Sequence, residues 1–342
     1  MIILRPVQPH DSEQLEHLAK VSGPLVSTLP DDRAHLLKKI ERSLASFAQT
    51  AVTPGDESYL FVLEETTTGK LLGTGGINAL AGHTAPFYSF RHDIKIHSSQ
   101  ALNVHNRVHA LTLNHDLSDH SQLCSFYICP ELLDSHYPAL ITLGRLLYMQ
   151  TFPQRFAEQC MAVLPGIFDE QGVAPFWEHV GRKFFGIDYQ QVKHYNSTHE
   201  KTFIAEMMPY HPLYVSLMDQ QAQDVLGRIH PNAQLQYALL NAQGFEHDKY
   251  VEIFDAGAIL TCTQQANTLA NNMYALQLRA DDTQPKSQCY LVAIQQENDF
   301  RACLLQGLLM DHQLLVNRDE ITQLKLTSQA RVSAVLITPT NN

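Results

Sequence analysis

The sequence predicts a mixed α/β fold of the α+β kind, followed by a small all-β appendage. Two observations support this prediction. Over residues 1–257, strand-like apolar segments alternate with segments whose apolar residues recur at helical spacing. Over residues 258–342, short apolar stretches are separated by polar ones, as in small β domains. With 342 residues, 44% of them hydrophobic, the chain is long enough for one large domain or two ordinary ones.

Composition excludes several classes of function. The formal net charge is −11 and Lys and Arg form no cluster, so neither a nucleic acid nor an anionic membrane is an expected partner. No apolar run approaches the roughly 18 residues that span a bilayer. The six cysteines form no CxxC pair, and no HxH or HExxH spacing predicts a metal site. We therefore expect a cytoplasmic protein with reduced thiols and no bound metal.

The first 80 residues predict a strand, two helices and a hairpin. Residues 2–7 form the expected strand, and Asp11 is placed to cap the first helix. The spacing of apolar residues predicts a second helix around residues 36–44. A buried strand at residues 59–63 is then expected to pair, through a tight turn, with residues 71–77.

The glycines Gly73, Gly75 and Gly76 invite a second interpretation, as a phosphate-binding loop. A loop of that kind opens a helix, whereas these glycines lie between two apolar stretches. We therefore expect glycines of a hairpin or of a β-bulge at these positions.

Residues 122–150 form the centre of the expected fold. The segment Leu123–Cys129 is short, apolar and aromatic, like a buried strand, and Pro130 ends it. From about Ala139 the apolar residues recur at helical spacing. A polar turn at residues 134–137 lies between them. Because a strand, a turn and a helix in this order can hold a phosphate at the helix N-terminus, this stretch is the first candidate for a ligand site.

Two later stretches, residues 174–181 and residues 237–244, share a pattern. Each predicts a helix that carries an aromatic residue on its inner face and ends in a left-handed glycine cap. A strand is expected after each helix, the first from Phe184 onward and the second at residues 250–254. Such a recurrence suggests a pseudo-repeat.

The expected domain organisation has two parts. Residues 1–257 form the main region, with possible halves at residues 1–190 and 191–257, and residues 258–342 form the β-rich appendage. The expected strands of the appendage are residues 259–262, 290–294, 301–309 and 331–337, with a partly looped segment at residues 264–288.

Short segments spread over residues 2–260 match one known family, in order. They are Arg5-Pro6-Val7, Thr28-Leu29-Pro30, Tyr59–Glu64, Pro86–Arg91, Val104-His105-Asn106, Asp169–Gly172, Pro175-Phe176-Trp177, Phe203–Glu206, His211–Tyr214, Gly227–Pro231 and Ile253–Gly257. On these segments the chain resembles the arginine/ornithine N-succinyltransferases of bacterial arginine catabolism. The resemblance implies a GNAT-like acyl-CoA N-acyltransferase fold. It also implies succinyl transfer from succinyl-CoA, a co-substrate, to the α-amine of L-arginine or L-ornithine, with no permanently bound cofactor.

The resemblance also implies where the reacting molecules lie. It suggests His230 as the residue that moves the proton in catalysis, and the strand position at Phe126 as a place for succinyl-CoA. The neighbouring Ser125 and Tyr127 are expected to contribute to that cofactor site. A lone His-Pro at residues 230–231 has helix entry as its structural alternative, and Phe126 has core packing.

Four further residues are candidates for the substrate site. His105 and Asn106 are expected to line a substrate cleft, with structural hydrogen bonding as the alternative. Asp169 and Glu170 would attract a cationic guanidinium or ornithine side chain, with a solvated turn as the alternative. A hydrolase that uses Cys124 and His230 is a disfavoured rival, because no sequence signature surrounds this cysteine and a buried thiol is usually inert.

The turn after the central strand departs from the family pattern. Single-chain members carry a basic, glycine-rich turn there, whose backbone N–H groups hold the CoA pyrophosphate. Residues 132–138 of this chain contain no glycine, lysine or arginine, Asp134 would repel phosphate, and Pro138 has no N–H. The chain therefore resembles the α subunit type, whose homologous β subunit keeps the glycine-rich turn. A scaffolding or regulatory subunit without a working CoA site is the alternative.

Overall fold

The computed structural model describes the chain except for residues 24, 25, 27, 51, 52, 199, 200, 265–267, 284, 286, 297, 298, 327–329 and 338–342. The strands are β1 (Ile2–Pro6), β2 (Ser58–Glu65), β3 (Lys70–Asn78), β4 (Ser89–Ser99), β5 (Val104–Asn114), β6 (Ser121–Ile128), β7 (Gln159–Val163), β8 (Leu213–Tyr214), β9 (Glu246–Val251), β10 (Ala258–Thr263), β11 (Tyr274–Ala280), β12 (Gln288–Gln296), β13 (Asp299–Met310), β14 (Gln313–Val316) and β15 (Arg331–Ile337). The α-helices are α1 (Ser12–Ser22), α2 (Arg33–Ala48), α3 (Tyr137–Thr151), α4 (Arg182–Phe185), α5 (Tyr189–Thr198), α6 (Thr202–Met207), α7 (Gln220–Val225), α8 (Gln234–Asn241), α9 (Thr268–Asn272) and α10 (Arg318–Gln323).

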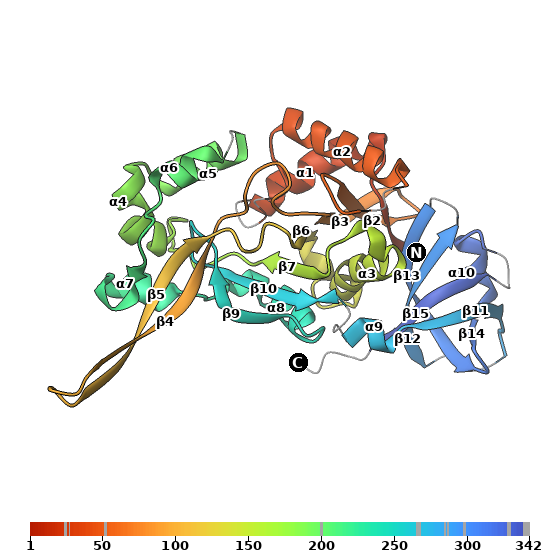
Figure 1. The fold of residues 1–342 in the computed structure, drawn as a ribbon. Coiled ribbons are helices and arrows are strands. Elements are labelled where there is room, and N and C mark those ends of the chain that lie inside the picture. The colour runs from red at the N-terminus through yellow and green to blue at the C-terminus, as the bar shows by residue number, and fades with distance from the viewer. Residues whose placement is uncertain are drawn as a thin grey trace.

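Helices cover both faces of the sheet around β2. Leu60 and Val62 pack against α1 and α2 on one face, whereas Tyr59, Phe61 and Leu63 pack against α3 on the other. Successive strand residues point to opposite faces, so a strand that is apolar throughout requires a helix layer on each side. Figure 1 shows α3 in the middle of the molecule, with α1 and α2 beyond β2 and β3. This arrangement confirms the mixed α/β class and the predicted N-terminal elements.

The glycines of β3 allow α3 to approach the sheet closely. A Cβ atom on Gly75 would lie 2.7 Å from Cγ2 of Ile141, and one on Gly73 would lie 2.9 Å from Cδ1 of the same isoleucine. The pairing of β3 with β6 also shifts register between Thr74 and Gly76. These glycines therefore belong to a strand with a bulge, as predicted, and not to a phosphate loop.

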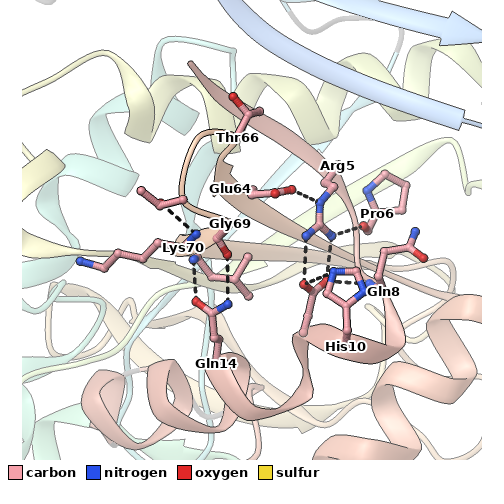
Figure 2. A network of polar contacts seen from close by, with 12 residues as sticks. Arg5, Pro6, Gln8, His10, Gln14, Glu64, Thr66, Gly69 and Lys70 are labelled. Carbon is pink, nitrogen blue, oxygen red and sulfur yellow. Dashed lines mark hydrogen bonds and ion pairs between the residues drawn. The ribbon is translucent and has the colours of Figure 1, made fainter. Parts of the chain in front are cut away.

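Asp11 stands at the N-cap position of α1, but its carboxylate does not cap that helix. Instead it accepts hydrogen bonds from the backbone N–H of Gln8 at 2.7 Å and from both terminal nitrogens of Arg5, while Nε of Arg5 bonds Glu64. Figure 2 shows Arg5 between Glu64 and the turn that carries His10. The predicted cap is therefore wrong, because the half-buried guanidinium of Arg5 is the stronger partner for this buried carboxylate.

The predicted glycine cap at Gly181 and the predicted strand from Phe184 are both wrong, and Trp177 explains why. A helical segment runs from Trp177 through Gly181 and continues as α4, so Gly181 is not a cap and no strand begins at Phe184. A Cβ atom on Gly181 would lie 2.2 Å from Cε3 of Trp177, so this glycine makes room for the indole ring. The left-handed cap is Gly186, with φ 68°. The matching cap at Gly244, with φ 85°, is present after α8.

The C-terminal strands close on themselves. β12 pairs with β13 and β15, β15 with β11, β11 with β14, and β14 with β13. β13 also pairs with β1, which joins this barrel to the main sheet. The four strands predicted after residue 257 are present, and β11 and β14 are additional. β10, which follows the expected boundary at residue 257, pairs with β7 and β9 of the main sheet; the division into halves stays a prediction.

The hairpin of β4 and β5 projects from the molecule at the end opposite the barrel (Figure 1). The sequence did not predict these strands, because their outer residues are mostly exposed and polar or charged. No helix within the described residues is long and apolar enough to cross a membrane.

Candidate acyl-transfer site

β6 and β7 run parallel and then separate. They pair only from Ser121 to Leu123 on β6 and from Cys160 to Ala162 on β7. Beyond that point Ser125 has a φ of 51°, and its N–H donates to Oγ1 of Thr28 at 2.7 Å. Where two neighbouring parallel strands part at their carboxyl ends, an extended ligand can lie between them. The structure thus places Ser125, Phe126 and Tyr127, the expected CoA-binding residues, at this opening.

Arg145 of α3 lies beneath the bulge of β6. Its Nη1 donates to the carbonyl oxygens of Gly76, at 3.2 Å, and Cys124, at 3.0 Å, and its Nε donates to that of Ile141. The side chain is completely buried, and the ring of Phe126 lies 5.7 Å from its Cζ. Burial lowers the pKa of Arg145 to about 10. The guanidinium therefore fixes the carbonyl groups around the bulge.

His230 stands at the carboxyl end of β7. The backbone N–H of His230 donates to the carbonyl oxygen of Pro165 at 2.9 Å, and Pro165 lies two residues after the strand. Its Nδ1 accepts a hydrogen bond from the N–H of Asn232 at 3.2 Å, as the cap of the short helix Pro231–Ala233. Because Nδ1 is an acceptor, the proton of the neutral ring is assigned to Nε2. Burial lowers the pKa of His230, and the nearby Asp255 opposes that shift. His230 is thus a neutral hydrogen-bond donor through Nε2.

Two carboxyl groups lie beside this histidine, in the turn between β9 and β10. Oδ1 of Asp255 accepts from the N–H of Gly257 at 2.7 Å, and its carboxylate also accepts from the N–H of Gly166. Oε2 of Glu252 accepts from the N–H of Phe254 and of Asp255, and the two acidic side chains share a hydrogen bond. Burial raises the pKa of both groups, and their mutual repulsion raises that of Glu252 further. The pair therefore holds a proton that separate carboxylates would lose.

Aromatic and cationic side chains complete this group. The rings of Phe168 and His230 are 6.0 Å apart, and those of Phe168 and Tyr189 are 5.4 Å apart. Nζ of Lys193 lies 5.6 Å from the centre of the Tyr189 ring, and the carboxylates of Asp255 and Glu252 act on its charge. The group around His230 thus presents both signs of charge next to the opening between β6 and β7.

The other predicted substrate residues are exposed. Asp169 and Glu170 are exposed, and Oδ1 of Asp169 accepts from two N–H groups of its own turn. His105 and Asn106 are exposed near the outer end of β5, in the hairpin that projects away from α8 (Figure 1). Within the described residues none of these four side chains makes a hydrogen bond or ring contact with the group around His230, although Asp169 directly follows Phe168, and their substrate roles stay predictions.

The turn before α3 offers few groups to a phosphate. Oγ of Ser135 accepts from the N–H of Tyr137 at 3.2 Å, and Pro138 at the second helical position has no N–H. Asp134 and His136 are exposed, and residues 130–138 contain no lysine or arginine. An anion at a helix N-terminus needs unpaired N–H groups, so this turn lacks much of what a pyrophosphate requires.

Sequence reasoning missed Arg145, Glu252 and Asp255. Arg145 stands alone in an apolar helix, which signals a charge that is buried against its neighbours. Glu252 and Asp255 gave no signal, because their meeting depends on the turn between β9 and β10. The rival site at Cys124 has no support from its surroundings, since this thiol is buried and makes its contact with Ser125. The described residues hold no cluster that could bind a metal ion.

Comparisons with known proteins agree along the whole chain. A family model described as arginine N-succinyltransferase beta subunit matches residues 2–268, and its C-terminal domain matches residues 275–335. Subunit alpha of the arginine N-succinyltransferase of Pseudomonas aeruginosa is 40% identical over 305 residues, which cover 89% of this chain and 90% of that protein. The solved structure of arginine/ornithine succinyltransferase subunit AI from Pseudomonas aeruginosa superimposes with a TM-score of 0.90 and 36% identity over 99% of both chains. GNAT-family acetyltransferases are more distant neighbours, with a TM-score of 0.37 and 8% identity for one from Desulfovibrio desulfuricans.

Proposed function

The chain belongs to the arginine N-succinyltransferase family, and from this premise we propose that it is the α-type subunit of an enzyme that uses succinyl-CoA. The enzyme transfers the succinyl group to the α-amine of arginine or ornithine. The observation that carries the proposal is the state of His230. Its Nδ1 accepts a backbone N–H, which leaves Nε2–H as a proton donor at the carboxyl end of β7, where β6 and β7 part.

The proposed step is a direct transfer. The neutral amine attacks the thioester carbonyl carbon, the N–C bond forms and the C–S bond breaks. Nε2–H of His230 donates a hydrogen bond to the reacting thioester, and the proton that the amine loses passes to the thiolate, so that the products are the amide and the free thiol. A positioned group that assists proton transfer contributes about 10²–10⁴-fold to the rate, and a neutral imidazole can polarise a carbonyl in this way. The anionic pair Glu252 and Asp255 favours a cationic substrate group nearby.

We propose that this chain works together with a homologous β chain that keeps the glycine-rich turn. The exposed, acidic turn before α3 supports this proposal, because it lacks the groups that hold a pyrophosphate. Six free cysteines support work in the reducing cytoplasm. The same turn favours one alternative function, in which the chain supports its partner and does not itself turn over substrate.

Turnover measurements test the proposal. The purified chain, a homologous β chain and their mixture are each incubated with succinyl-CoA and arginine or ornithine, and the N-succinyl product is quantified by mass spectrometry. We expect product from the mixture, and an arrest of turnover when His230 of this chain is changed to Asn. Unchanged turnover by that variant mixture would favour the supporting role, and no product from the mixture would refute the proposed activity.

A further inference from the structure

Two buried arginines, Arg145 and Arg155, and the half-buried Arg5 have very different partners. Arg5 bonds two carboxylates, those of Asp11 and Glu64. Arg155 donates to the hydroxyl of Tyr148 at 2.9 Å and to a backbone carbonyl, and it stacks on the ring of Phe152 at 4.7 Å. Arg145 bonds backbone carbonyls alone. Within the described residues neither Arg145 nor Arg155 has a carboxylate partner, and each keeps one buried nitrogen without a hydrogen bond, Nη2 in Arg145 and Nε in Arg155. Arg145 is the one of the two that bonds backbone carbonyls alone, beside the bulge of β6.

The second terminal nitrogen of Arg145, Nη2, has no hydrogen-bond partner among the described residues. Its side chain has 0% exposure, and the ionisable groups that act on it most are the thiols of Cys124 and Cys160. An unpaired charge in such a place costs several kcal/mol. Buried groups left unsatisfied in a native structure usually have a function or await a partner. The unpaired Nη2 of Arg145 is therefore a candidate binding group for an anion.

The position of Arg145 indicates which anion would reach it. Arg145 is the ninth residue of α3, so it lies about 12 Å along the helix axis from the turn where a pyrophosphate would lie. It is next to the bulge of β6, and the half-buried ring of Phe126 lies over its guanidinium. If a CoA thioester lay with its pyrophosphate at that turn, its phosphates would be too far from Arg145 to reach it, and its acyl group would be the part next to Arg145.

We propose that Arg145 is the residue that selects the acyl donor, and that its Nη2 edge binds the free carboxylate of a dicarboxylic acyl group carried on CoA. This proposal rests on the proposed function and adds a basis for its donor specificity. The ring of Phe126 moves aside to admit the acyl chain. A guanidinium edge binds a carboxylate through charge-assisted hydrogen bonds, and this would neutralise the buried charge. An acetyl group, without a carboxylate, would leave the edge unsatisfied.

The test compares two donors in the assembled enzyme. Arg145→Met also frees the carbonyls of the bulge and so lowers kcat/KM with both donors, and we expect the fall with succinyl-CoA to exceed the fall with acetyl-CoA by about 100-fold. Arg145→Lys keeps the charge but not the planar edge. For this variant we expect kcat/KM to fall about tenfold with succinyl-CoA and not with acetyl-CoA. Arg155→Met is the matched control, since it removes another buried guanidinium and should leave the ratio of the two donors unchanged.

Binding gives a readout that does not depend on turnover. A thioether analogue of succinyl-CoA should bind the wild-type protein more tightly than the thioether analogue of acetyl-CoA, and Arg145→Lys should reduce that preference. Equal losses for both donors, or equal binding of both analogues by the wild type, would overturn the role of Arg145. Absence of N-succinyl product from the wild-type enzyme would instead refute the proposed function, while the analogue preference would still decide the role of Arg145.

Discussion

Helix α3 has two regions of opposite character. Its N-terminal turn, residues 130–138, is exposed and acidic, and it uses an N–H group internally through Ser135. Two turns further on, Arg145 is wholly buried and keeps an unused N–H edge. In the proposed function, the first region is where the pyrophosphate of a CoA molecule is expected, and the second is where its acyl group is expected. The chain thus lacks binding groups at one end of the expected ligand path and has them at the other.

From this difference we infer that binding of the phosphates and handling of the acyl group are separable in the proposed enzyme. The groups at the reacting end, His230, Arg145 and Asp255, are fixed by backbone hydrogen bonds from three segments. None of those bonds involves the turn before α3. The proposed division of labour follows, in which this chain keeps the acyl-transfer end and a homologous partner binds the phosphates. The predictions below sharpen or break this comparison.

The largest effect is expected from His230→Asn. The Asn side chain can still accept the N–H of Asn232 and cap the helix, but it supplies no acidic proton in place of Nε2–H. We expect kcat of the assembled enzyme to fall about 10²–10⁴-fold, with little change in thermal stability. Steady-state kinetics and a melting curve check this. His247→Asn on β9 is the matched control, and an equal loss in that variant would show that the effect is not specific to His230.

Gly75→Ala tests the close contact that positions Arg145. The added Cβ would meet Ile141 at 2.7 Å and Cδ of Arg145 at 3.0 Å, so we expect a loss of about 1–3 kcal/mol in the free energy of unfolding. Denaturant unfolding measures it. Gly55→Ala is the control, because its nearest neighbour is the flexible carboxylate of Glu57 at 3.2 Å. Equal stability of both variants would mean that α3 can shift without cost.

A change in the turn before α3 should have a smaller effect of opposite sign. In Asp134→Gly/Ser135→Ala, a repelling charge is removed and the N–H of Tyr137 is released. We expect the affinity of this chain for CoA to rise about two- to fivefold, as for other charge effects at helix N-termini. Isothermal titration calorimetry measures this, with Asp119→Asn as a control at an exposed turn. A weaker affinity would contradict the anion-repelling character of the turn.

The smallest expected effect is on the pH dependence of stability, through the carboxyl group of Glu252. Its pKa in the folded chain is raised above its ordinary value of 4.5, so folding takes up a proton as the pH rises above 4.5. The stability that this group contributes is therefore present at low pH and lost as pH rises through the raised pKa. Glu252→Gln removes that loss, and its melting temperature relative to wild type should rise by about 2–4 °C from pH 5 to pH 8. A constant difference over this range would show that the pKa is not raised.

Local patterns predicted the strands β1, β2, β3 and β6 and the helices α1, α2, α3 and α8, but not the strands β4, β5, β7 and β8 or the helices α5, α6 and α7. The strand at β2 and the helix α3 were predictable because long apolar runs at a clear spacing specify an element without knowledge of its neighbours. The hairpin of β4 and β5 was not, because its outer residues are largely solvated and lack a buried face. Asp11 and Gly181 show a second limit, since a buried arginine and an indole ring, both reached only in the fold, decide their roles.

The residues of the candidate acyl-transfer site were less predictable from the sequence than the elements of the fold. His230 and the strand around Phe126 came from resemblance to a family, and the structure shows what local geometry they have. Arg145 and the pair Glu252 and Asp255 depend on contacts between segments that are far apart in sequence, such as Arg145 with Gly76 and Cys124. No spacing in the sequence reports such a contact.

The most direct measurement is a calorimetric titration of succinyl-CoA into this chain alone, and then into its mixture with a homologous chain that carries the glycine-rich turn. Little heat from the chain alone and clear binding by the mixture are the results that a divided ligand site predicts. Tight binding of succinyl-CoA by the isolated chain would contradict it.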